Sequence, residues 1–234
     1  MNRALAALLI FIGVTMSANA QSVNMSNYWP SPVVGEQLLV QDATTAYGPE
    51  ILSVLHRYRV GAPIGGKAVT QLDDYITTTG WLDAWFLYRN GPSIIEVANT
   101  FPVNKRNVYK AGKEITWGAT MNVGDVTQGA IEIDLTKSTG IVAGPSNYGW
   151  QRITYEAFLP TFTNDGGLAF TNVVRMRVFQ SWCKTNACDY PAGQSSYEMT
   201  YWMAPGVGMI QIDYLAPTVR RDYAKSVTRT ALIP

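Results

Sequence analysis

The sequence predicts a mainly β protein built on antiparallel sheet with one apolar face. Apolar and polar residues alternate with a period of two through most of the chain, and turn residues recur between the short runs. Charged residues make up only 15% of the chain, whereas Trp, Tyr and Phe make up 12%. This composition favours sheets with a broad apolar face over a helical protein rich in surface charge.

The first twenty residues have the features of a secretion signal. Arg3 provides a positive start, Ala4 to Val14 is a short apolar run, and Ala18 to Ala20 is a small-residue cleavage site. The apolar run is shorter than the about 20 residues that a membrane-spanning helix needs. We therefore expect cleavage before Gln21, no membrane span afterwards, and a soluble periplasmic or secreted protein. Residues 21–234 are expected to form a single β domain.

The mature chain is close to neutral. Cleavage removes one cation, Arg3, so Lys plus Arg falls from 18 to 17, against 17 Asp plus Glu. A neutral chain without a basic excess argues against nucleic acid and anionic lipid headgroups as partners.

Strand-like runs are separated by turn residues along most of the chain. Two hairpins are predicted, one around Asn90–Pro92 and one around Asn164–Gly167. The expected strands are Val33–Val40, Leu82–Tyr88, Ser93–Ala98, Ile131–Leu135, Tyr155–Phe162 and Val173–Trp182. Pro49 to Tyr58 fits a helix or a strand, and we interpret it as a strand. Val69 to Thr78 has the pattern of a short helical turn.

The closing segment, Tyr197 to Leu215, predicts a hairpin around the turn Pro205–Gly208. On a strand, side chains two residues apart share a face. One expected face therefore carries Tyr197, Met199, Tyr201 and Met203, and one face of the return strand carries Ile210, Ile212 and Tyr214.

Both cysteines lie close together, at Cys183 and Cys188. In an exported protein this spacing predicts a small disulfide loop that fixes a loop tip between strands. Redox motifs usually separate their cysteines by two residues, so catalytic thiol chemistry is not expected.

The chain contains few residue patterns that are typical of catalytic sites. His56 is the only histidine, so a Ser-His-Asp triad and most zinc sites would require it. Among carboxylates, adjacent Asp73 and Asp74 should point in different directions, and Glu132 and Asp134 should share a solvated strand face. The turn at Asn164–Gly167 lacks the further oxygen ligands of a calcium loop. No metal and no cofactor are expected.

Aromatic and methionine side chains are abundant, and they fit two interpretations. Either they fill a packed core, or some of them line a cavity for an apolar or sugar ligand, where methionine would adapt to flexible acyl chains. The candidates for such a cavity are Trp85, Trp117, Met176, Met199, Tyr201, Met203, Ile210 and Ile212.

Two short segments carry a family resemblance. The stretch Tyr201 to Met209 resembles the W-x-A-P-G-V-G-hydrophobic segment that closes many exported bacterial proteins of uncharacterised function. Those proteins are similar in architecture to the lipoprotein carriers LolA and LolB. The opening segment Tyr28 to Val40 and the stretch Leu87 to Gly91 look like other parts of the same group.

The resemblance implies one large, strongly curved antiparallel sheet that forms an open half-barrel, with one or two short helices as a lid. It also implies binding of a lipid or acyl chain without chemical change. The Cys183/Cys188 loop, a mature N-terminus without a lipid acceptor and the lack of a long lid helix depart from the carriers. Two alternatives stay open: a cell-envelope interaction module, suggested by the basic segment Thr218–Pro234, and a carboxylate-based secreted hydrolase.

Overall fold

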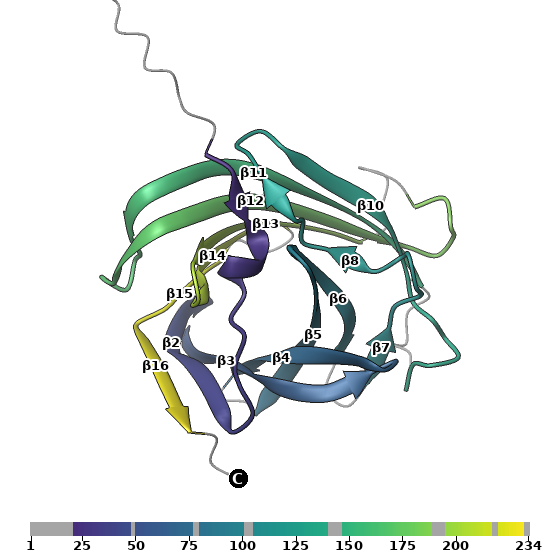
Figure 1. Ribbon diagram of the computed structural model, residues 1–234, viewed down its shortest axis with the longest axis horizontal. Helices are drawn as coiled ribbons and strands as arrows, with labels where there is room; N and C mark the ends of the chain where they lie inside the picture. The colour runs from purple at the N-terminus through teal and green to yellow at the C-terminus, as the bar shows by residue number, and fades with distance from the viewer. Residues whose placement is uncertain are drawn as a thin grey trace, which may run out of the picture.

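The structure is a computed structural model that describes residues 21–47, 50–76, 80–100, 105–139, 147–188, 195–216 and 220–231 (Figure 1). Within these ranges nearly all regular structure is antiparallel strand, which confirms the predicted mainly β class. The helical element there is η1 (Met25–Tyr28), a single 3-10 turn. No helix among the described residues is long and apolar enough to cross a membrane. The signal segment lies outside the described residues.

The strands form two large sheets and one small one. The six-stranded sheet contains, in order, β10 (Val126–Glu132), β11 (Tyr148–Thr163), β12 (Ala169–Cys183), β13 (Ser195–Ala204), β14 (Gly208–Ala216) and β15 (Arg220–Tyr223). The eight-stranded sheet contains β16 (Ser226–Ala231), β2 (Glu36–Tyr47), β3 (Glu50–Ile64), β4 (Lys67–Ile76), β5 (Trp81–Asn90), β6 (Ser93–Thr100) and β7 (Arg106–Val108), with β8 (Ile115–Thr116) also paired to β6. The small sheet pairs β1 (Val23–Asn24) with β9 (Thr120–Met121).

The prediction of one large sheet is wrong, because the ladder breaks between β7 and β10. Residues 105–125 carry closely spaced turns, with Gly112, Gly118 and Gly124 at positive φ, so only strands of two or three residues form there. Only isolated bridges such as Tyr109 with Ile133 connect the flanking segments, and β10 pairs with β11 instead. The expected lid helices are not found in the described ranges.

The ambiguous segments are both strands. Residues 50–58 belong to β3, as interpreted, whereas Pro49 lies outside the described residues. The helical turn predicted from Val69 is wrong, because those residues form β4 and pair on both sides, with β3 and β5. A strand with neighbours on both sides satisfies its backbone groups in the ladders, and this overrides local helical spacing. The first predicted strand starts at Glu36 rather than Val33.

All three predicted hairpins are confirmed, including the closing one, in which β13 and β14 pair across the turn Pro205–Gly208. Strands β5 and β6 pair across the turn at Gly91, and β11 and β12 pair across the turn that follows Asn164. In β12 the side chains of Val174, Met176 and Val178 are buried, as the alternation predicted. The alternation over Ile131–Leu135 holds in part, since Ile131 and Ile133 are buried and Leu135 is exposed.

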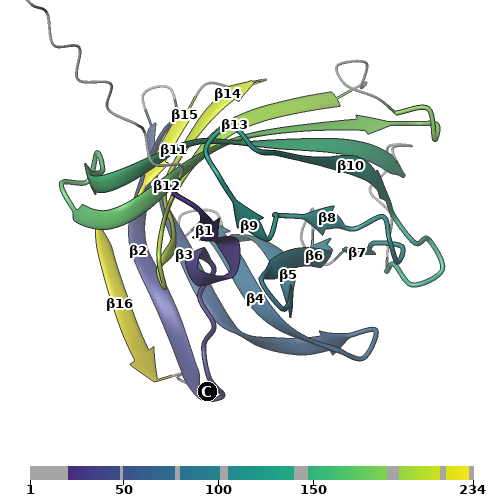
Figure 2. The same cartoon turned by 45° about the horizontal axis from the view of Figure 1, so that its top comes forward.

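The two large sheets lie on either side of a shared interior, and η1 lies between them (Figures 1 and 2). Strand β15 ends the six-stranded sheet beside β2, and the chain then continues into β16 at the edge of the eight-stranded sheet. One large cluster of buried apolar side chains draws on both sheets and on η1. The interior is therefore built from the facing sides of both large sheets.

The tip of the β11–β12 hairpin is fastened to the β14–β15 pair by Asn164. Its side-chain amide donates to the carbonyl oxygens of Ile210 at 3.1 Å and Ala224 at 2.7 Å, and its Oδ1 accepts from the Leu168 N–H at 3.0 Å. Asn164 is buried, and the Ala224 carbonyl and the Leu168 N–H depend on this side chain for a partner, whereas the Ile210 carbonyl also accepts from the Ala224 N–H.

We expect the substitution Asn164→Ala to lower the free energy of unfolding by about 2 kcal/mol, because it leaves buried backbone groups without partners. Chemical denaturation at constant pH measures this change. The matched control is Thr171→Ala, on the same hairpin at an exposed position, which should change stability by less than about 0.5 kcal/mol. Equal effects of the two substitutions would contradict the anchoring role of Asn164.

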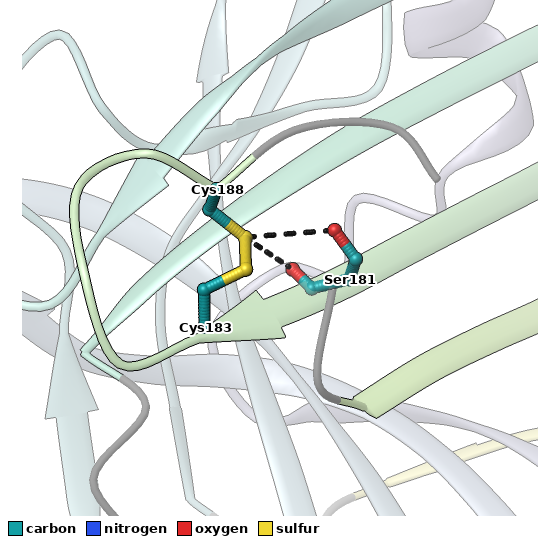
Figure 3. The surroundings of a disulfide bond; sticks show 3 residues. All are labelled: Ser181, Cys183 and Cys188. Atoms are coloured by element: carbon teal, nitrogen blue, oxygen red, sulfur yellow. Dashed lines mark hydrogen bonds between the residues drawn. A yellow bond between two sulfur atoms is a disulfide. The ribbon is translucent and has the colours of Figure 1, made fainter. Parts of the chain in front are cut away.

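The predicted disulfide between Cys183 and Cys188 is confirmed (Figure 3). Their Cα atoms lie 5.4 Å apart, within the range that a disulfide bridges. Cys188 Sγ lies 3.6 Å from the hydroxyl oxygen and 3.7 Å from the carbonyl oxygen of the buried Ser181. The bond closes an exposed loop, residues 184–187, at the end of β12.

Candidate functional site

The interior between the two large sheets is unusually rich in methionine. The chain has eight methionines, and all six beyond residue 20 belong to one buried apolar cluster. They are Met25, Met121, Met176, Met199, Met203 and Met209. Thioether side chains are flexible and polarisable, so they adapt to neighbours of different shape.

Seven of the eight cavity candidates contribute to this interior. Six are buried members of the cluster, and Trp85 packs against it. The buried six are Trp117, Met176, Met199, Tyr201, Met203 and Ile212. The rings of Trp117 and Tyr201 meet edge to face with centroids 5.7 Å apart, so these candidates are in mutual contact.

The expectation that Ile210 shares a face with Ile212 is wrong. The β13–β14 register slips between Trp202 and Met203, so Met203 lies opposite Met209 instead of Ile210. Such a bulge moves the residues beyond it to the other face of the sheet. Ile210 therefore packs in a separate small cluster with Val173, beside the ring of Trp202.

Residues 23–30 of the chain occupy the interior. The side chains of Met25, Tyr28 and Trp29 are at most 4% exposed, and the ring of Trp29 lies 5.0 Å from that of Trp117. Tyr28 donates its hydroxyl hydrogen to the carbonyl oxygen of Asn172 at 2.8 Å. We call residues 23–30 the N-terminal segment. It takes up space that an interior ligand would otherwise fill.

Polar contacts to the N-terminal segment go mostly to its backbone. Arg89 donates from Nη1 to the Ser26 carbonyl oxygen at 2.6 Å and from Nη2 to the Trp29 carbonyl oxygen at 2.9 Å. The Gly206 N–H donates to the Asn27 carbonyl oxygen at 2.8 Å, and the Met25 N–H donates to Ala119. The Gly206 contact joins the two ends of the chain that carry the family resemblance.

One carboxylate, Glu96 of β6, is buried beside this interior. Its Oε1 accepts a hydrogen bond from the Tyr109 hydroxyl at 3.2 Å, and Asn99 Nδ2 donates to the Tyr109 oxygen at 2.7 Å. Burial raises the pKa of Glu96 to about 7, and hydrogen-bonding groups of Tyr109, Trp117 and Asn99 oppose that shift. The indole N–H of Trp117 nevertheless has no partner at hydrogen-bonding geometry. A substantial fraction of Glu96 is therefore protonated near pH 7, unlike an ordinary carboxyl.

His56 lies inside the fold, far from the arrangement of a catalytic triad. Its Nε2 is 3.5 Å from Asp74 Oδ1, and it lines a small pocket against β14 and β15 that also includes Asp222. The empty space in the pocket is about 170 Å³ even with open solvent included, so the pocket is not a formed ligand cavity. Its lining contains no serine, threonine or cysteine, but it includes Asp222 and Tyr223.

The carboxylate pairs behave as the sequence predicted. Asp73 accepts from Arg57 and Arg59, whereas Asp74 faces His56 on the opposite side of β4. Glu132 forms an ion pair with Lys110, and Asp134 pairs with Lys137, so neither is poised for acid–base work. No cluster of potential metal ligands occurs among the described residues.

The basic C-terminal segment is partly neutralised within the chain. Arg221 forms ion pairs with Asp213 and Asp165, and Arg229 lies 3.3 Å from Glu36. Its positive charge is therefore less available to a partner than the sequence suggested.

Sequence reasoning missed three features of this site: the burial of Glu96, the inward position of Met25 to Trp29, and the hydrogen bonds that Arg89 donates to the N-terminal segment. A signal for Glu96 exists, because a single acid stands in the apolar run Ser93–Ala98. The other two depend on contacts with segments far away in the sequence, and no local pattern encodes those contacts.

No protein-family model and no curated protein matches the chain. Among solved structures, the chain is similar to the crystal structure of a Bacteroides fragilis protein described as exported, with a YmcC-like fold. The TM-score is 0.48 and the sequence identity is 11%, over 86% of this chain and 98% of that one. At these values the similarity says nothing about function, and it gives no specific support for the resemblance to LolA and LolB.

Proposed function

We propose that the protein binds an apolar ligand, a lipid or acyl chain, between its two large sheets and does not change it chemically. The observation that carries this proposal is the composition of the interior: all six methionines beyond residue 20 lie there beside Trp29 and Trp117. Ligand sites are mostly apolar with few polar groups, and the buried ionisable side chains around this interior are few, among them Glu96, Asp222 and His56.

Part of the proposal concerns shape. We infer that the eight-stranded sheet forms an open half-barrel whose concave side faces the ligand. Methionine side chains from the six-stranded sheet, such as Met176 and Met203, then cover the ligand from the other side. Their flexibility supports binding of chains that vary in length and branching.

The non-enzymatic part of the proposal rests on the described side chains. His56 has an acid partner in Asp74, but no serine, threonine or cysteine lines its pocket, and Glu132 and Asp134 are held in ion pairs with lysines. A binding protein needs none of these groups. Export is proposed as well, and N-terminal sequencing of the protein from envelope or culture fractions should give Gln21 as the first residue.

Fluorescence quenching tests the ligand site. We expect 9,10-dibromostearate to quench the tryptophan fluorescence of the purified protein, because bromine atoms quench indoles that they contact. The double variant Trp29→Phe/Trp117→Phe should lose most of this quenching. The control Trp202→Phe should keep it, because Trp202 packs in a separate cluster. No quenching of the parent protein, together with no lipid in its solvent extract by mass spectrometry, would refute lipid binding.

A cell-envelope interaction module is the second candidate, and one observation favours it. In the described part of the chain β10 pairs only with β11, and Val126, Gln128, Gly129 and Ala130 of β10 are exposed. An uncharged edge of this kind can accept a strand from another chain. A photo-crosslinker at Gln128 should then yield one discrete adduct in envelope extract, and a crosslinker at Thr171 should not. Equal patterns at both positions would contradict it.

A further inference from the structure

Arg89 holds the N-terminal segment in the way that an arginine holds a carboxylate. Its two terminal nitrogens donate separately to two carbonyl oxygens, those of Ser26 and Trp29, at 2.6 and 2.9 Å. The guanidinium presents its donors in a planar fork, and the usual partner of such a fork is a pair of carboxylate oxygens. The two backbone carbonyls thus stand where a carboxylate would bind.

The charge of Arg89 is not neutralised by these contacts. Both acceptors are neutral carbonyl oxygens, and no ion pair of Arg89 is found among the described residues. Partial burial lowers the pKa of Arg89, although the residue as a whole is exposed, so its cation keeps part of its solvation and has no anion beside it in these contacts. A carboxylate at the same place would supply the missing countercharge.

The apolar part of the segment has the character of the ligand proposed above. Met25, Tyr28 and Trp29 are buried against the cluster that contains Met203 and Trp117. Exposing these large apolar side chains to water is unfavourable, so the segment leaves the interior only rarely unless something apolar replaces it. In addition, the indole nitrogens of Trp29 and Trp117 are buried without hydrogen-bond partners, which reduces the stability of the packed arrangement.

We propose that the N-terminal segment occupies the ligand site itself and exchanges with an amphiphile that has an apolar chain and a carboxylate head. The chain takes the place of Met25 and Trp29, and Arg89 releases the two carbonyls and binds the carboxylate. This inference rests on the proposed function. It adds that the ligand carries a carboxylate, that Arg89 binds this head group, and that the N-terminal segment competes with the ligand for the site.

The selectivity for a carboxylate is tested with dodecanoate and 1-dodecanol, both below their aggregation concentrations. The parent protein should bind dodecanoate at least ten-fold more tightly than 1-dodecanol. In Arg89→Met the preference should disappear, while binding of 1-dodecanol stays or becomes tighter because the segment is less firmly held. The control Arg177→Met removes an exposed ion pair with Glu198 and should keep the preference. An unchanged preference in Arg89→Met would overturn the assignment.

The exchange is tested by locking the segment in place. Asn24 and Thr120 are exposed register partners in the β1–β9 pair, and directly opposed Cα atoms lie at distances that a disulfide spans. The oxidised double variant Asn24→Cys/Thr120→Cys should lose dodecanoate binding at least ten-fold and regain it on reduction. The parent protein, treated with the same reductant, controls for the native disulfide. Full binding by the locked protein would show that the segment does not cover the site.

A third measurement needs no ligand and separates the two proposals. Ser26 is buried, so Ser26→Cys should react slowly with a maleimide, and adding Arg89→Met should speed the reaction at least several-fold. If no probe binds and the cysteine still becomes reactive, the proposed function fails while the release of the segment stands. If the cysteine stays unreactive in both proteins, the exchange is refuted.

Discussion

Substituting Gly208 by alanine is expected to destabilise the protein by about 3 kcal/mol. Gly208 has φ of +90°, a conformation that costs a residue with a side chain about 1 kcal/mol or more. An added Cβ would also lie 2.3 Å from the Tyr58 hydroxyl and 3.1 Å from Pro30 Cδ. Tyr58 is fully buried and bonded to the Met209 N–H at 3.2 Å, so it cannot move aside without losing that contact.

Gly206, two residues earlier, provides the matched control. It also has positive φ, at +68°, but a Cβ there would meet nothing within 4 Å. Gly206→Ala should therefore show only the conformational cost, about 1 kcal/mol. The difference between the two variants in chemical denaturation isolates the steric contact with Tyr58 and Pro30. Equal losses would mean that the turn, and not its contact with the interior, determines stability.

Substituting Glu96 by glutamine is expected to make stability less dependent on pH. The pKa of Glu96 is about 7 in the folded protein, raised by burial from the ordinary 4.5. Below pH 4.5 the carboxyl is neutral in both states and imposes no penalty. Between pH 4.5 and 7 the unfolded chain releases the proton and the folded chain keeps it, so stability falls as pH rises. Above pH 7 the loss is complete.

The predicted size of this loss is on the order of 3 kcal/mol between pH 4 and pH 8. Glutamine keeps an oxygen for the Tyr109 hydroxyl and carries no charge. The free energy of unfolding of Glu96→Gln, relative to that of the parent protein, should therefore rise by that amount from pH 4 to pH 8. The control Glu198→Gln changes an exposed carboxylate and should show no such trend. A constant difference between Glu96→Gln and the parent would refute the raised pKa of this buried carboxyl.

Local patterns were sufficient to predict most strands and the disulfide, because the alternation of side chains and the cysteine spacing are themselves local. The division into two large sheets was not predictable in this way. It depends on the short, turn-rich residues 105–125, whose strands are too brief to leave a period in the sequence. The strand β4 shows the same limit, since its pairing partners on both sides decide its conformation.

The site was predictable only in part, for a related reason. Alternation placed Met199, Tyr201 and Met203 correctly on one face, but it cannot foresee the bulge that turns Ile210 to the other face. Trp29 lies in the interior, and its carbonyl oxygen accepts a hydrogen bond from Arg89, which stands 60 positions later in the chain. Interactions of this range arise from the assembled fold.

The contacts between the two ends of the chain also determine the order in which the protein can fold. The Tyr28 hydroxyl meets Asn172, 144 residues later, and the Tyr58 hydroxyl meets Met209, 151 residues later. Synthesis runs from the N-terminus, so the Tyr28 contact cannot form before Asn172 has been made, and the Tyr58 contact cannot form before Met209 has been made. Contacts of such long range form slowly, since a large loop has to close first. During that interval the methionines of the interior are uncovered, so a ligand of the class proposed above would find the interior open.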